Sequence, residues 1–167
     1  MLNQLVDTSY SKEDVVILLQ DVKGRVPVLD TEEREKLNQS GVHYSEMLPL
    51  EYRPTEKYME IYQESLDTLS SETANAIELL CEKLIAKKGK DIVIVSLARA
   101  GTPVGILAKR YIKFKWGYDV PHYSISIIRG KGIDVAAMNY IVDKHGVNGV
   151  QFLDGWVGKG AINGVLD

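Results

Sequence analysis

The second half of the sequence alternates short apolar runs with longer amphipathic ones, and this alternation constrains the fold more than any other feature. The apolar runs are Ile92–Val95, Tyr123–Ile128 and Val150–Leu153. Between them, Pro103 behind Thr102 predicts a helix start and Gly117 its end, and Asp134 predicts the cap of a helix that runs to about His145. Strands that alternate with helices of this length predict an α/β fold with a parallel sheet and right-handed crossovers.

The first part of the chain is more polar and predicts shorter elements. Ser11 is placed to cap a short helix through Leu19, and Thr31 begins another helix. From Thr55 to Lys88 the apolar spacing predicts a long helix with a break near Ser70. We therefore divide the chain into residues 1–66 and a core of residues 67–167. Three core strands are few for a complete open sheet, so we expect a core truncated at its C-terminus.

Composition places the chain among ordinary cytoplasmic domains. It has 167 residues, of which 45% are hydrophobic and 26% charged, and its net charge is −3. The charge argues against nucleic-acid binding by this region, and no apolar run approaches the ~20 residues of a membrane span. The one cysteine, Cys81, excludes an internal disulfide and suits a reducing compartment. The sequence does not decide whether the chain forms a homodimer.

Three loops follow the predicted strands, at the sheet edge where α/β proteins bind ligands. The first, Ser96–Pro103, joins a strand to a helix N-terminus, where backbone N–H groups favour an anion, and Arg99 could add a bidentate donor. A plain tight turn would explain the same residues. The second, Arg129–Gly132, suits a flap that closes over a charged substrate, although solvated loop charge is the alternative.

The third loop begins at Asp154, directly after a strand. Its carboxylate could accept hydrogen bonds from sugar hydroxyls, and the glycines of Gly158-Lys159-Gly160 could expose N–H groups to a phosphate. The spacing differs from a Walker loop, because no Ser or Thr follows Lys159. Glycines that only make a turn are the alternative.

Cys81 lies on the same helical stripe as Ile77 and Leu84, which predicts a small core residue and not a nucleophile. No motif links the histidines to it. Among His43, His122 and His145, we keep only His43 as a candidate site residue.

The strand and loop Val150–Gly160 resemble the PRPP-binding motif of type I phosphoribosyltransferases, and Ser96–Gly101 resembles their pyrophosphate loop. Longer stretches, Ser40–Pro49, Ser96–Gly105 and Pro121–Gly130, are similar to one bacterial family. This is the phosphoribosyltransferase-like family of tellurium-resistance and stress gene clusters, whose members are also labelled "cysteine protease StiP". The resemblance implies a type I phosphoribosyltransferase (Rossmann-like) core, with residues 1–66 as an N-terminal hood.

The resemblance also implies residue roles. Asp154, Arg99 and Lys131 would be catalytic, with Asp154 holding the ribose hydroxyls. The groups that bind PRPP, with Mg²⁺ as cofactor, would be Ala98, Arg99, Ala100, Gly101, Arg129, Gly155, Gly158, Lys159, Gly160 and Ala161. No metal-ligating residue is assigned. The hood would line the acceptor site with Tyr44, Glu46 and Tyr52. Gly155 departs from the motif, which has a second acid there.

The function that follows is PRPP-dependent phosphoribosyl transfer to a nitrogenous acceptor, with release of pyrophosphate, in stress or tellurium-resistance metabolism. The first alternative is a PRPP-binding regulatory module without turnover, which Gly155 favours. A structural partner in a stress complex is another. A cysteine protease ranks lower, because of the position of Cys81.

Overall fold

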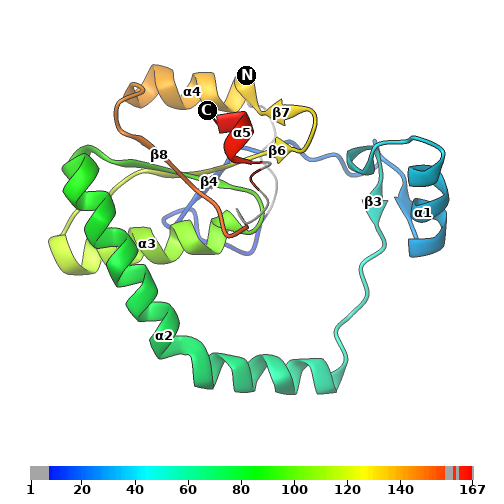
Figure 1. Cartoon of the computed structure of the whole chain (residues 1–167), viewed down its shortest axis with the longest axis horizontal. Helices are drawn as coiled ribbons and strands as arrows, with labels where there is room; N and C mark the ends of the chain where they lie inside the picture. The colour runs from blue at the N-terminus through cyan, green and yellow to red at the C-terminus, as the bar shows by residue number, and fades with distance from the viewer. Residues whose placement is uncertain (1–7, 157–159, 161, 167) are drawn as a thin grey trace. The chain divides into compact units, whose positions relative to one another are not determined.

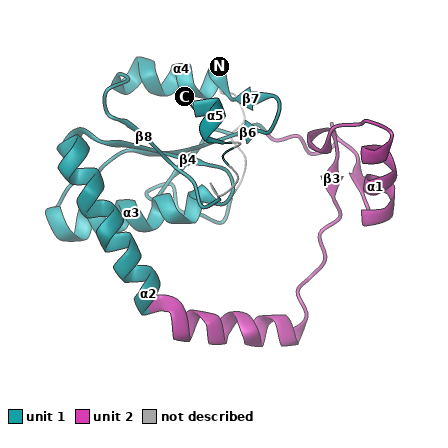
Figure 2. Cartoon of the chain, viewed as in Figure 1, with its two compact units in different colours: residues 1–20, 71–167 teal, residues 21–70 magenta. Residues whose placement is uncertain are grey.

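The computed structural model describes residues 8–156, 160 and 162–166, and the chain divides into two compact units (Figure 2). Unit 1 comprises residues 1–20 and 71–167, and unit 2 comprises residues 21–70. The long helix α2 (Glu56–Lys88) contributes its first part to unit 2 and its second part to unit 1. It is continuous through Ser70 and Ser71, so the break predicted there is absent.

A four-stranded parallel sheet forms the centre of unit 1; the sequence predicted a parallel sheet with three of these strands. Its order is β1 (Val16–Ile17), β5 (His122–Ile125), β4 (Val93–Leu97) and β8 (Val150–Leu153). In β4, Val95 lies opposite Tyr123 on one side and Phe152 on the other. The coarse prediction of an α/β fold is therefore confirmed.

Strand β1 replaces the helix predicted after Ser11. The residues that follow Ser11 form a turn, and Val16 then pairs with Tyr123 of β5. The β-branched Val15, Val16 and Ile17 suit an edge strand better than a helix, because their χ1 freedom is lost in a helix. The pairing partner lies more than a hundred positions along the chain, so the local pattern could not reveal it.

Helices cover both faces of the sheet (Figure 1). Helix α3 (Gly101–Trp116) and the second part of α2 pack on one face, and α4 (Val135–His145) packs on the other. Alternate residues of β4 face the two layers: Ile94 belongs to the cluster with Cys81, and Val95 to the cluster with Ile141. Two predicted helix signals are confirmed, since Gly117 ends α3 in the left-handed region and the Asp134 carboxylate caps α4. Helix α3 begins at Gly101, two residues before the start predicted at Pro103.

The predicted strand Tyr123–Ile128 is split in two. Strand β5 ends at Ile125, and β6 (Ile127–Ile128) pairs instead with the antiparallel β7 (Gly132–Ile133). The turn between them uses Gly130 and Gly132 at φ 80° and 93°, a region that favours glycine. The loop Arg129–Gly132 is thus the tip of a short hairpin. Two small elements complete unit 1, η2 (Gly89–Asp91) and α5 (Asn163–Leu166).

Unit 2 is built from short elements. Strands β2 (Val28–Leu29) and β3 (Leu48–Pro49) form a parallel pair, with α1 (Thr31–Gln39) and the 3-10 turn η1 (Tyr44–Glu46) between them. Helix α1 begins where predicted, with a capping box in which Asp30 accepts from the Glu33 N–H and Glu33 from the Asp30 N–H. Among the described residues, no helix is both long enough and apolar enough to span a bilayer.

Candidate functional site at the carboxyl edge of the sheet

The strand order places a topological switch point between β4 and β8. From β4 the chain crosses through α3 to β5 on one side, whereas β8 pairs with β4 on the other side. Ligands of open α/β sheets bind outside the carboxyl ends of the strands at such a point. The loops that leave β4 and β8 are the first and third of the predicted loops. We call residues 98–101 and 154–155 the switch-point loops.

The two switch-point loops approach each other backbone to backbone. A Cβ atom on Gly101 would lie 2.4 Å from the carbonyl oxygen of Leu153, and one on Gly155 would lie 2.8 Å from that of Ala100. Real Cβ atoms are not found this close to a carbonyl, so both positions require glycine. Close packing against Ala100 therefore explains why glycine, and not the second acid of the motif, stands at position 155.

Hydrogen bonds fix the first loop to the neighbouring strand. The Ala98 N–H donates to the carbonyl of Ile125 at 2.9 Å, and the hydroxyls of Thr102 and Ser124 lie 2.8 Å apart, both buried. The peptide bond between Ala98 and Arg99 is cis. The Thr102 N–H donates to the Arg99 carbonyl at 3.2 Å. The N-terminus of α3 is therefore held firmly at the sheet edge.

The charged candidates lie around this edge. Arg99 is exposed, and Asp154 is half-buried with one carboxylate oxygen accepting from the Gly155 N–H at 2.8 Å. Arg129 and Lys131 are exposed at the hairpin tip beyond β6, and β7 of that hairpin contacts α5. Gly160 has φ 71°. Gly158, Lys159 and Ala161 lie outside the described residues. The structure brings the described parts of the first and third loops into contact.

A buried polar network that the sequence did not reveal lies beneath the first loop. The His122 ring donates from Nδ1 to the Asp14 carbonyl at 2.8 Å, and its Nε2 lies 2.8 Å from the Ser96 hydroxyl. Since a carbonyl can only accept, Nε2 accepts from Ser96. Burial lowers the pKa of His122 to about 4, so the ring is neutral. The Asp14 carboxylate pairs with Arg110 of α3, which tethers the N-terminal segment.

Cys81 is fully buried in the core between α2 and α3, as the sequence predicted. Its thiol donates to the Ala108 carbonyl at 3.6 Å, and no surface of the side chain is exposed. Burial raises the pKa of the Cys81 thiol to about 11. A nucleophilic thiolate needs the opposite, a lowered pKa and access to substrate. Cys81 is therefore a structural residue.

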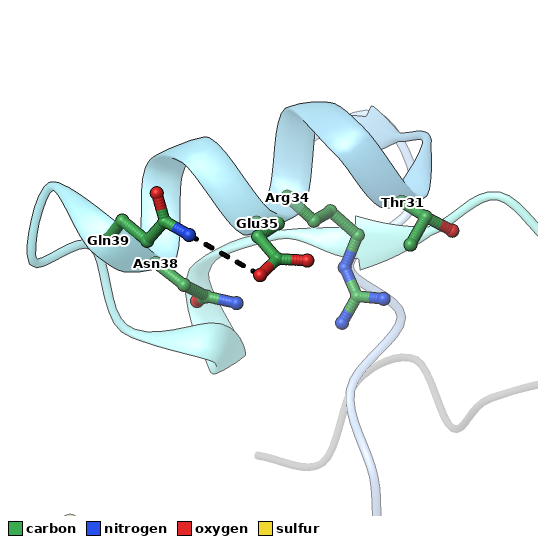
Figure 3. Close-up of a pocket in the computed structure, with 5 residues that line it drawn as sticks. All are labelled: Thr31, Arg34, Glu35, Asn38 and Gln39. Carbon is green, nitrogen blue, oxygen red and sulfur yellow. Dashed lines mark hydrogen bonds between the residues drawn. The ribbon is translucent and has the colours of Figure 1, made fainter.

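The candidates of residues 1–66 lie in unit 2. His43 caps η1, with its Nδ1 accepting from the Ser45 N–H at 3.3 Å, while Tyr44 and Tyr52 are exposed, as is Glu46. Unit 2 also has a polar hollow of about 370 Å³ on α1 (Figure 3). It is lined by Thr31, Arg34, Glu35, Asn38 and Gln39, with Gln39 donating to Glu35. Within the described part of the chain, no three His, Cys, Asp or Glu residues cluster as metal ligands.

The fold defines an α/β protein with a parallel sheet, and comparison with known proteins gives the family. Residues 8–167 match the family described as tellurite-like stress resistance cysteine protease StiP, and the chain belongs to this family. The chain is 40% identical over 163 residues to a protein of Acinetobacter baylyi named cysteine protease StiP. The match covers 97% of the chain and 42% of that relative. No solved structure matches the chain significantly.

These comparisons overturn the predicted function. The predicted transfer of a phosphoribosyl group from PRPP, the transferase class and the PRPP-based keywords are wrong, because the family and the relative are named for a protease, a hydrolase. The protease reading, which we ranked below PRPP transfer and PRPP binding, is the one that the names support. The predicted link to tellurium resistance and stress is confirmed. Loops of this kind occur in proteins with many different activities, so they do not specify a reaction.

Proposed function

We propose that the protein acts in tellurite-like stress resistance and that its sheet unit binds an anionic ligand at the switch-point loops. The family description supports the first part. The second part is supported by a helix N-terminus at the switch point, where N–H groups and the helix dipole favour an anion. Arg99 would add a charged donor. Asp154 would accept from a hydroxyl or ammonium group next to the anion.

The observation that carries this proposal is the N-cap of α3. In α1 and α4 the N-cap is an aspartate, Asp30 or Asp134, whose carboxylate accepts from the first turn. In α3 the N-cap is Ala100, which has no side-chain acceptor. Of the first three residues of the 16-residue helix, Thr102 donates its N–H to the Arg99 carbonyl and Pro103 has none, so the Gly101 N–H is the one left for another acceptor, at the edge where such sheets bind ligands.

Calorimetry with inorganic phosphate tests this proposal. Ala100→Asp should cap α3 with its own carboxylate and abolish phosphate binding while the fold is retained. Arg99→Gln should weaken binding by roughly tenfold, as expected for the loss of one charged donor. Arg53→Gln, an exposed arginine of unit 2, is the matched control and should bind as the unaltered protein does. Undiminished binding by Ala100→Asp would refute the assignment of the site to α3.

Peptide hydrolysis is the second candidate function, which the names of the family and of the relative favour. We propose that any such activity uses a nucleophile other than Cys81. A thiol with a pKa near 11 is almost wholly protonated at neutral pH, and the core packing closes it to a substrate. The chain spans 42% of its named relative, so the activity of the whole relative is not transferred to it.

Several finer predictions stay predictions. These are the type I phosphoribosyltransferase topology of the core, the hood formed by residues 1–66, the Mg²⁺ ion and the cytoplasmic location. The described residues offer no cluster of carboxylates that would hold a metal ion by itself. No step of a mechanism is therefore assigned to Mg²⁺.

A further inference from the structure

Arg34 of helix α1, in unit 2, is an arginine for which the described residues provide no acceptor. Its side chain is partly buried, as is that of Leu37 one turn farther along, whereas the other residues of α1 are exposed. The Arg34 Nε atom is buried without a hydrogen-bond partner, and no other buried side-chain nitrogen or oxygen of the described residues lacks one. A buried donor without an acceptor loses its water and gains nothing in return. An acceptor from outside the described chain would therefore stabilise this side chain.

The carboxylates next to Arg34 along α1 are engaged with other donors. Glu33 accepts from the Asp30 N–H at 3.3 Å, and Glu35 accepts from the Gln39 amide at 3.3 Å. Successive helical residues point about 100° apart, so Arg34 and Glu35 do not face each other as a pair. A guanidinium does not lose its proton in a protein. Arg34 thus stays a cation, with its Nε buried and its charge unpaired among the described residues.

Arg34 and Glu35 both line the polar hollow of about 370 Å³ on α1. Figure 3 shows their side chains and that of Asn38 extending from the same side of the helix. Thr31 and Gln39 complete the lining. The volume lies near the lower end of the roughly 300–1,000 Å³ of small-molecule sites. The hollow therefore offers a positive and a negative group, two amides and a hydroxyl to a small polar ligand.

We propose that this hollow binds a small zwitterion of the amino-acid type, with the carboxylate on Arg34 and the ammonium on Glu35. The planar guanidinium matches a carboxylate, to which it can donate two parallel hydrogen bonds. Glu35 would pair with an ammonium group and repel a second negative charge, which disfavours a dianion such as phosphate. The Asn38 amide can donate to the carboxylate or accept from the ammonium. This site lies in unit 2 and does not depend on the switch-point loops.

An NMR titration of the full chain tests this proposal, with the Nε–Hε signal of Arg34 as the readout. The probes are L-alanine, acetate and inorganic phosphate, and Arg34→Lys assigns the signal by its loss. L-alanine should shift the signal and saturate, while acetate, which lacks the ammonium, should bind more than about tenfold more weakly. Phosphate should also bind more weakly than L-alanine, because its second negative charge meets Glu35.

A matched pair of glutamate variants locates the ammonium. Glu35→Gln should weaken the binding of L-alanine by roughly tenfold without weakening that of acetate. Glu64→Gln, at an exposed glutamate of α2 outside the hollow, should change neither. A pair of arginine variants, followed by the amide signals of α1, locates the carboxylate. Arg34→Lys keeps the charge but loses the planar fork and should weaken L-alanine by roughly tenfold, whereas Arg25→Lys, at an exposed arginine outside the hollow, should not.

Circular dichroism should show equal helix content in the four variants. The proposal is overturned if L-alanine leaves the Arg34 signal unchanged, or if the three probes bind equally well, because the hollow would then be no zwitterion site. It is equally overturned if Glu35→Gln binds L-alanine as tightly as the unaltered protein does.

Discussion

The buried imidazole of His122 should make the stability of unit 1 fall as the pH is lowered into the mildly acidic range. Burial lowers the pKa of His122 from 6.5 to about 4. Between these values the unfolded chain binds a proton that the folded chain does not, so stability is present above the unfolded pKa and is lost as the pH falls. Linkage gives a loss of about 2 kcal/mol between about pH 7.5 and about pH 5, and about 3 kcal/mol below about pH 4.

The titration of Asp14 and Glu78 does not mask the loss of stability between about pH 7.5 and about pH 5. The hydrogen bond from Arg110 lowers the pKa of Asp14, and those from Tyr111 and Lys115 lower the pKa of Glu78, so each carboxylate stays ionised to a lower pH than an ordinary one. Their contribution to stability is lost only at more acidic pH. Within the window the histidine is therefore the main buried group that changes charge.

Urea unfolding followed by the fluorescence of Trp116, which packs against the unit 1 core, measures the effect. His122→Asn should be less stable near neutral pH, because the Ser96 hydroxyl loses its partner at 2.8 Å and keeps only the Tyr123 carbonyl at 3.2 Å. It should also lose most of the pH dependence, since its side chain does not titrate; burial lowers the pKa of His145 too, so a smaller decrease of the same sign remains. His43→Asn in unit 2 is the control and should keep the full decrease. A decrease of the same size in His122→Asn would refute the assignment to this ring.

Two further predictions concern packing. Gly101→Ala would place a Cβ 2.4 Å from the Leu153 carbonyl oxygen, so we expect it to lower stability by about 1–3 kcal/mol and to abolish phosphate binding. Gly164→Ala has open space at its Cβ and should change neither property. Tolerance of alanine at both positions would contradict the packing. Mass spectrometry should show that Cys81 reacts with iodoacetamide only after the protein is unfolded in urea, and rapid alkylation of the folded protein would contradict its burial. Cys81→Ala should keep any peptidase activity.

The sequence predicted most of the core because its signals are local. Gly117 and Asp134 end and begin helices through their own backbone and side-chain chemistry, and a continuous apolar run such as Val150–Leu153 suits a strand packed between layers. Strand β1 was predicted wrongly because Val16 owes its conformation to Tyr123, its pairing partner from a distant part of the chain. No local pattern carries that information.

The candidate site, too, could be predicted only in part from the sequence. The glycines and Arg99 of the predicted loops could be recognised from residue type and from their place after a strand. The contact of Gly155 with Ala100, and the network of His122, Ser96 and Asp14, depend on which strands become neighbours, and so they needed the structure. The reaction could not be predicted from these loops, because loops of this kind are compatible with many chemistries.

The most direct test of the proposed site is an amide-resolved NMR titration of the full chain with inorganic phosphate. The amide signals of Ala100, Gly101, Thr102 and Gly155 should shift together and saturate at a common concentration, because one anion contacts the start of α3 and the facing loop. Ala100→Asp should remove these shifts. The proposal is contradicted if phosphate shifts only amides near surface lysines, or if it leaves the start of α3 unchanged.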